Sequence, residues 1–138
     1  MSKLLERLLD ASRSGVYRAS RDEAIRDATR GSRLDVATIS LSAGKDAQLE
    51  RIAAALGFPD WFGRNWDALE DCLTDLSWRE GDGHVLLFTG FTRDDDFGIL
   101  LDVLASSAES WAERRKPFFA VFVDPESRLE LPPLFRGA

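Results

Sequence analysis

The stretch 58–76 constrains the fold of this chain more than any other, because a tight turn runs directly into an amphipathic helix there. Pro59 and Gly63 punctuate its first half, and Asn65 is a residue type that accepts a hydrogen bond at a helix N-cap. At about 100° per residue, the positions from Trp66 onward separate into two opposed faces. One face is expected to enter a core, while the other presents three carboxylates. The apolar face holds Leu69, Cys72, Leu73 and Leu76, and the polar face holds Asp67, Glu70, Asp71 and Thr74.

The polar face of this helix is a candidate binding surface. Like charges at these spacings repel by about 0.2–0.5 kcal/mol per pair, so three neighbouring carboxylates do not help the helix to form. The helix dipole offsets part of the repulsion at Asp67, which lies in the first turn. Trp61 and Phe62 stand beside the carboxylates, and Gly63 precedes the helix. An acidic surface rimmed by aromatic side chains suits docking onto a cationic partner, although a merely solvated amphipathic helix would give the same pattern.

The same residues carry a resemblance to a known family. Residues 61–65 read Trp-Phe-Gly-Arg-Asn, and residues 67–74 read Asp-Ala-Leu-Glu-Asp-Cys-Leu-Thr. This run resembles the binding segment of the barstar family, intracellular inhibitors of the ribonuclease barnase, in which an aromatic pair, Gly, any residue and Asn precede the helical run. The order of elements matches more loosely over 34–124. Residues 1–31 and the last part of the tail have no counterpart in the small prototype of the family.

By this resemblance the chain is an immunity or antidote protein that covers the active site of a basic ribonuclease. Asp71 would enter the cationic pocket that normally holds the substrate phosphate, where its two oxygens would accept charge-assisted hydrogen bonds. Glu70 stands where the prototype of the family has a tryptophan, and Trp66 stands where the prototype has a leucine. The lost aromatic contact and added charge at Glu70 indicate a different and more basic nuclease. The other partner-binding residues that the resemblance implies are Trp61, Phe62, Gly63, Asn65, Asp67, Glu70 and Thr74.

Composition narrows the class of partner. A formal charge of −6 argues against a nucleic-acid binder, which needs a basic stripe, and favours a cationic protein attracted over a long range. The single cysteine, Cys72, cannot form an internal disulfide, and its place on the apolar side of the helix predicts a buried small hydrophobe. Charged residues interrupt the leucines of residues 1–15, so neither a signal peptide nor a membrane span is expected. We therefore expect a cytoplasmic protein.

Apolar periodicity predicts alternating strands and helices. Ser20 and Glu23 match a capping box at the start of the second helix, and Thr92 is expected to cap the last one. The aspartates at 94–96 suit a helix N-terminus. The first two strands flank a helix and should therefore run parallel. Strands are predicted at 15–19, 34–41, 85–88 and 118–123, and helices at 3–11, 20–28, 46–56, 66–76 and 92–116.

These elements predict an α/β fold of the barstar-like type, with two or three layers, in which helices pack on a small, mainly parallel sheet of three to four strands. A length of 138 residues with 44% hydrophobic residues suits a single domain spanning 1–138. An N-terminal helix and β-α extension are expected over about 1–31. Pro125, Pro132 and Pro133 predict an extended tail over about 124–138.

Enzymatic chemistry fits these residues poorly. His84 is the only histidine, and we expect a structural role for it rather than metal ligation. Asp67, Glu70 and Asp71 could hold magnesium or act as acid and base, but an exposed helical face lacks the pocket that shifts a carboxyl pKa, and no phosphate-binding glycine loop is present. No catalytic residue, metal or cofactor is therefore expected. Two alternatives stay open: a barstar-like module that binds another protein or assembles through its N-terminal helix, and a carboxylate-based metal-dependent enzyme.

Overall fold

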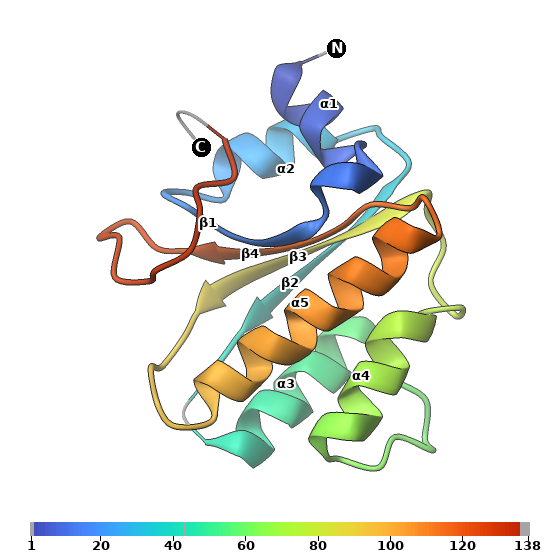
Figure 1. Ribbon diagram of the computed structural model, residues 1–138, viewed down its shortest axis with the longest axis vertical. Coiled ribbons are helices and arrows are strands. Elements are labelled where there is room, and N and C mark those ends of the chain that lie inside the picture. Colours follow the sequence, from blue (N-terminus) through green and yellow to red (C-terminus); the bar gives the residue numbers. More distant parts are fainter. Residues whose placement is uncertain (1, 43, 136–138) are drawn as a thin grey trace.

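One four-stranded sheet lies between two layers of helices in the computed structural model, which describes residues 2–42 and 44–135 (Figure 1). Helices α1 (Lys3–Leu8) and α2 (Glu23–Thr29) cover one face of the sheet, and η1 (Ala11–Arg13) is a turn of 3-10 helix. Helices α3 (Lys45–Leu56), α4 (Trp66–Asp75) and α5 (Phe97–Glu113) form the layer on the other face. The predicted α/β class is confirmed, and the number of layers is three.

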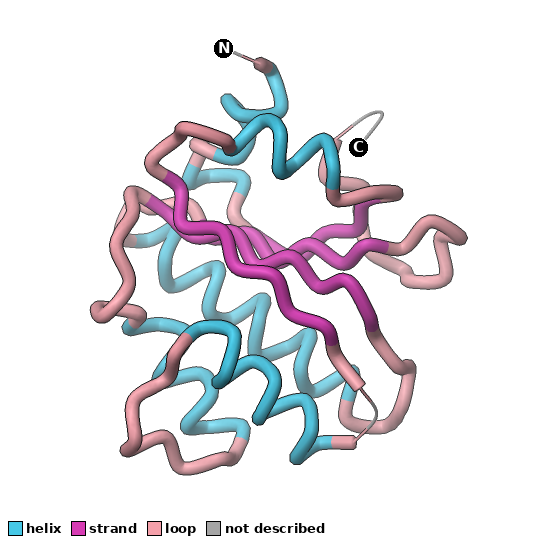
Figure 2. Tube along the Cα trace, turned by 180° about the vertical axis from the view of Figure 1, so that it is seen from behind, coloured by secondary structure: helices cyan, strands magenta, loops and turns pink. Residues whose placement is uncertain are grey.

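The sheet is parallel throughout and has the strand order β1-β4-β3-β2. Its strands are β1 (Gly15–Ala19), β2 (Leu34–Ser40), β3 (Gly83–Gly90) and β4 (Phe118–Val123). The first two strands run parallel, as predicted, but they lie at opposite edges and do not pair with each other. The central places go to β3 and β4, whose continuous apolar runs suit strands that are covered on both faces. Figure 2 shows the same sheet and its two helical layers from behind.

Alternating side chains of the central strands divide the interior into two cores. On β3, Val85 and Leu87 face the core under α1 and α2, whereas Leu86 and Phe88 face the core shared with α3, α4 and α5. The rings of Phe88 and Phe122 stack at a centroid distance of 4.5 Å in this second core. A period of two along a strand that is buried on both sides produces this division.

Two of the predicted helix caps are wrong. Helix α2 begins at Glu23 with Asp22 in the N-cap position, so Ser20 lies outside it and forms no capping box. Helix α5 begins at Phe97 rather than after Thr92. The segment before α5 is instead held by tertiary contact, because the carboxylate of Asp94 accepts a hydrogen bond of 3.1 Å from the backbone N–H of Gly44 at the start of α3.

The described part of the C-terminal tail, residues 124–135, turns after Asp124 and then runs along the β1 edge of the sheet, while residues 136–138 of the expected tail lie outside the described residues. The N–H of Arg18 donates to the carbonyl of Pro132 at 3.0 Å, and the N–H of Leu134 donates to the carbonyl of Arg18 at 2.9 Å. Leu134 is fully buried in the core under α1 and α2. Strand β1 and the C-terminal tail therefore complete one side of the sheet. The described residues contain no helix that could span a lipid bilayer.

Candidate protein-binding site

Local capping fixes the start and the end of α4. The side-chain oxygen of Asn65 accepts a hydrogen bond of 2.7 Å from the N–H of Ala68, and Leu76 ends the helix in the left-handed conformation. Leu69, Cys72 and Leu73 are fully buried, which confirms the predicted apolar face. Because this face packs against α5 and the sheet core, the opposite face of α4 is held on a rigid support.

Removal of the cap gives a first prediction. Asn65→Ala should lower the free energy of unfolding by about 1 kcal/mol, because the Ala68 N–H loses its partner. Asn65→Asp should keep most of the stability, since aspartate caps as well as asparagine. Urea unfolding of the three proteins measures both effects. An alanine variant with wild-type stability would show that this contact does not stabilise α4.

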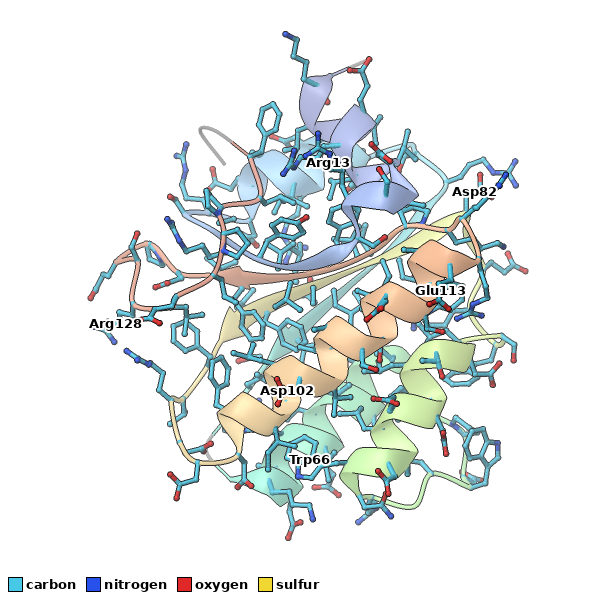
Figure 3. All side chains as sticks on the ribbon, viewed as in Figure 1. Arg13, Trp66, Asp82, Asp102, Glu113 and Arg128 are labelled. Atoms are coloured by element: carbon cyan, nitrogen blue, oxygen red, sulfur yellow. The ribbon has the colours of Figure 1, made fainter. Side chains whose placement is uncertain are left out.

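The exposed side of α4 carries a row of carboxylates, which we call the acidic face: Asp67, Glu70, Asp71 and Asp75. Asp67, Asp71 and Asp75 are exposed, and none of the four forms an ion pair with another described residue. Sequence reasoning overlooked Asp75, although its place four residues after Asp71 puts it on the neighbouring part of the same helix surface. Figure 3 shows the side chains of α4 in the setting of the whole domain.

Two predicted site residues are less accessible than expected. Glu70 is half-buried rather than exposed, because it lies on the flank of the helix towards Leu73. Thr74 is also half-buried, and its hydroxyl donates to the carbonyl of Glu70 at 2.8 Å. The most accessible part of the acidic face is therefore centred on Asp67 and Asp71.

Aromatic side chains border the acidic face on the loop before α4. Trp61 is 61% exposed, and its ring lies edge-to-face with that of Trp78 at a centroid distance of 6.5 Å. Phe62 is half-buried and packs edge-to-face on Phe58 at 4.9 Å. Trp66 is half-buried and packs against the core. Only Trp61 offers a largely free aromatic surface among these residues.

Two side chains at the end of α5, Trp111 and Arg114, contact the end of α4. The indole N–H of Trp111 donates to the carbonyl of Leu73 at 2.7 Å, and the guanidinium of Arg114 donates to the carbonyl of Thr74 at 2.6 Å. The same guanidinium lies 3.7 Å from the centroid of the Trp111 ring. These contacts satisfy carbonyl groups that the end of a helix leaves without partners, and they place a cation beside the last turn of the acidic face.

Cys72 and His84 both lie in the interior of the protein. Burial raises the pKa of the Cys72 thiol to about 11, and the nearby charges of Asp71 and Asp75 act in the same direction. A protonated, buried thiol is a poor nucleophile. Nδ1 of His84, which is 4% exposed, lies 2.9 Å from the carboxylate of Asp35. In the described parts of the chain, no group of three or more His, Cys, Asp or Glu side chains could hold a metal ion.

Asp35 joins His84 to Arg79 on the side of the sheet where β2 and β3 begin. Nε and Nη2 of Arg79 donate to the two oxygens of Asp35 at 2.6 and 2.8 Å. Burial alone would raise the pKa of Asp35, but the hydrogen bonds from His84 and Arg79 outweigh it and lower this pKa to about 2. This cluster of partly and fully buried polar side chains connects β2, the loop after α4 and β3.

Comparison with known proteins places the chain in a family. A family model described as Barstar (barnase inhibitor) matches residues 34–123. The chain belongs to the barstar family. No curated protein sequence matches it. The matched segment runs from the start of β2 to the end of β4, so α1, β1, α2 and the tail lie outside it.

Family membership confirms the resemblance that was based on residues 61–74. The barstar family is a family of inhibitors. Within this barstar-family chain, the turn and α4 bring the predicted residues onto one side of the molecule. Trp61, Asp67 and Asp71 are accessible there, whereas Phe62 and Thr74 pack partly behind them.

Proposed function

We propose that this chain is a protein inhibitor that binds a basic ribonuclease and covers its active site with the acidic face of α4. The observation that carries the proposal is the row of exposed carboxylates without ion-pair partners among the described residues, presented by a rigid helix of a barstar-family chain. A pocket built to hold phosphate is also suited to a carboxylate. We also propose that residues 1–138 act as one domain, as an immunity protein in the cytoplasm.

Each residue of the proposed interface has a separate role. Asp71 would enter the phosphate pocket, and Asp67 would form a second charged contact one turn earlier. Trp61 would stack against the rim of the active site, since it is the most exposed of the aromatic residues beside α4. Gly63 and Asn65 would allow close approach of the backbone and amide, while Phe62, Glu70 and Thr74 would form the flank of the contact.

A binding experiment with a blocked active site tests this arrangement. Calorimetric titration should detect binding to a basic ribonuclease such as barnase when its active site is free. Saturation of that active site with a nucleotide ligand should weaken the apparent affinity in proportion to ligand occupancy. Unchanged affinity would mean that the two proteins meet elsewhere on the nuclease.

Ionic strength should change the rate of association more than the rate of dissociation. The acidic face attracts a basic partner over a distance that screening shortens from about 10 Å at 0.1 M to about 3 Å at 1 M salt. Stopped-flow mixing over this range should show a steep fall in the association rate. An association rate that is indifferent to salt would point to an apolar interface away from α4.

Glu70 provides a test of partner preference. Glu70→Trp restores the aromatic residue of the family at a half-buried flank position and should improve binding to a barnase-like enzyme while weakening binding to a more basic cognate nuclease. Glu70→Gln is the matched control, because it removes the charge and keeps the shape. Melting curves of both variants should stay near that of the wild type. Equal affinities of all three proteins for both nucleases would remove Glu70 from the interface.

Glu70 is also compatible with a second function, binding of a basic protein that is not a ribonuclease. A carboxylate in place of the aromatic residue is also what a barstar-family module would carry if its cationic partner were not a ribonuclease. Such a module would bind a basic protein with the salt dependence described above but would leave RNA cleavage unaffected. The enzyme assay and the binding assay together therefore separate the two functions.

A further inference from the structure

The two edge strands of the sheet, β1 and β2, differ in whether another segment of the chain covers them. The tail covers the edge of β1 through the hydrogen bonds between Arg18, Pro132 and Leu134. At the other edge, none of the backbone hydrogen bonds formed outside the helices and the sheet involves residues 35–40, within the part of the chain that the structure describes. Residues 36–40 read Val-Ala-Thr-Ile-Ser and contain no charge and no proline, the residues that commonly block an open edge. Within the described part of the chain, the carbonyl of Ser40 is the one backbone group on this edge that accepts a further hydrogen bond, so the β2 edge can still pair with another strand.

Hydrogen bonds at the end of β2 show which backbone groups face outward. The N–H of Leu41 donates inward to the carbonyl of Gly90, whereas the carbonyl of Ser40 accepts a hydrogen bond of 3.1 Å from Arg51 on the outer side. Backbone groups alternate in direction along a strand. The pairing with β3 shifts between Ile39 and Ser40, whose partners are Phe88 and Gly90, so the additional residue belongs to β3 and β2 keeps its alternation. The N–H and C=O groups of Val36, Thr38 and Ser40 therefore point away from β3, with Thr38 at the centre of the open stretch.

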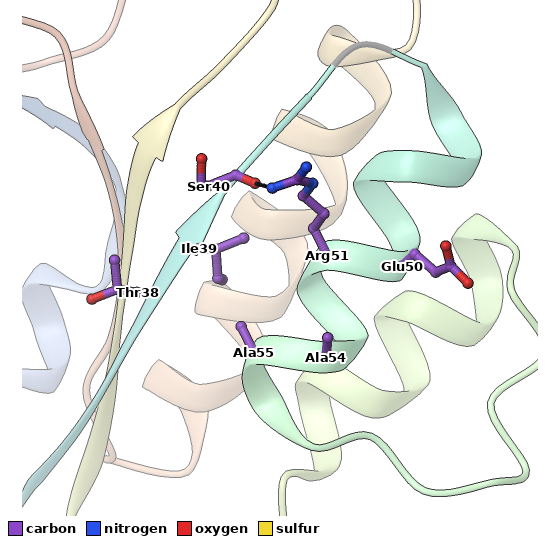
Figure 4. Close-up of a pocket in the computed structure, with 7 residues that line it drawn as sticks. All are labelled: Thr38, Ile39, Ser40, Glu50, Arg51, Ala54 and Ala55. Atoms are coloured by element: carbon purple, nitrogen blue, oxygen red, sulfur yellow. Dashed lines mark hydrogen bonds between the residues drawn. The ribbon is translucent and has the colours of Figure 1, made fainter.

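A groove runs beside this edge, between β2 and α3 (Figure 4). Its volume is about 590 Å³. Ala54 and Ala55 of α3 form part of its wall, and their short side chains leave the strand accessible. Glu50 and Arg51 bring one charge of each sign to the same groove. Both side chains are exposed, and Glu50 forms an exposed ion pair with Arg64 at 3.5 Å. A surface that carries both signs can face its own copy across a two-fold axis.

We propose that β2 pairs with β2 of a second copy of this chain, antiparallel and about a two-fold axis at Thr38, so that the two sheets become continuous. In this register each Thr38 lies opposite its counterpart, a favourable cross-strand pair. Val36 then lies opposite Ser40 of the other copy, and Ala37 lies opposite Ile39, which sets a small side chain against a large one. The outward N–H and C=O groups of these strands form the ladder, and the second lone pair of the Ser40 carbonyl remains available beside Arg51.

This interface is independent of the proposed inhibition. No residue of the acidic face lines the groove. The two associations should also respond to salt in opposite directions, because each copy carries a charge of −6 and repels its partner at low ionic strength. Added salt should therefore strengthen the dimer and weaken the complex with a basic ribonuclease, so failure of one proposal leaves the other intact.

Sedimentation equilibrium of the full chain between about 1 µM and 1 mM tests the dimer. Thr38→Pro should weaken dimerisation about tenfold or more, because proline removes the outward N–H without removing a bond to β3. Thr38→Val is the matched control: it loses the hydroxyl that accepts a hydrogen bond from Arg26 and keeps the backbone donor. Melting curves verify that both variants fold. A wild-type protein that stays monomeric at all concentrations, or equal dimerisation of both variants, would overturn the proposal.

A charge exchange at the same position tests the register without proline. Thr38→Lys and Thr38→Glu should each dimerise several-fold more weakly than the wild type, because like charges then face each other at the axis. An equimolar mixture of the two variants should recover dimer formation. Two variants that remain monomeric when mixed, or that dimerise as well alone as together, would exclude Thr38 from the axis.

Discussion

Asp71→Ala should weaken binding to the cognate ribonuclease by about 2–5 kcal/mol, which is roughly 30-fold to several thousandfold in the dissociation constant. This is the general cost of removing one member of a charged pair that is buried at an interface, because the cationic groups of the partner are then left unpaired. Asp71 is exposed on a helix whose other face is fully buried, so the free protein loses little stability from the change. The effect should therefore be seen in affinity and in the dissociation rate.

Asp27→Ala is the matched control for this change in charge. Asp27 lies on α2, on the opposite side of the sheet from α4, and forms an exposed ion pair with Arg30. Its replacement should leave the dissociation constant nearly unchanged. If Asp71→Ala stayed within about threefold of the wild type, as Asp27→Ala is expected to, the acidic face would not be the centre of the interface.

Asp35→Ala should lower the free energy of unfolding by about 3 kcal/mol at neutral pH, because it leaves the charge of Arg79 and the ring of His84 without their partner. The side chains of Asp35, Arg79 and His84 are 13%, 23% and 4% exposed, so water replaces the lost contacts incompletely. Asp82→Ala is a suitable control, since Asp82 forms an exposed ion pair with Arg33 that should contribute less than about 1 kcal/mol.

The pH dependence identifies the charge of Asp35 as the cause. Its pKa is lowered from 3.8 to about 2 in the folded protein, so the carboxylate stabilises the fold above the unfolded pKa, and this contribution is lost as the pH falls through the folded pKa. The difference in urea stability between wild type and Asp35→Ala should therefore narrow between about pH 4 and pH 2. A constant difference over this range would assign the effect to packing.

Local pattern predicted the types of the main elements because their signals lie within a few residues. The bounds of β4 follow from a short apolar run, and the two faces of α4 follow from helical spacing. The start of α5 did not follow in this way. Thr92 has the chemistry of a cap, but the contact from Asp94 to Gly44 holds this segment, and that contact depends on the placement of α3.

Residues that are distant in the sequence explain what local reasoning missed. The order of the strands places β1 and β2 at opposite edges because the most apolar strands take the centre, which the chain order alone does not reveal. The contact of Trp61 with Trp78 joins the loop before α4 to the loop after it. The partial burial of Glu70 depends on which residues pack beside α4. Helical spacing predicts the direction of a side chain around the helix axis but not which neighbouring residues cover it.

Titration of RNA cleavage tests the central claim most directly. A basic ribonuclease of the barnase type, at a concentration above the expected dissociation constant, is mixed with increasing amounts of this protein, and cleavage of a fluorogenic RNA is recorded. The account predicts that activity falls linearly to zero at one inhibitor per enzyme. It also predicts that the Asp71→Ala variant leaves most of the activity at the same ratio. A complex that forms but still cleaves RNA, or equal inhibition by both proteins, would contradict the account.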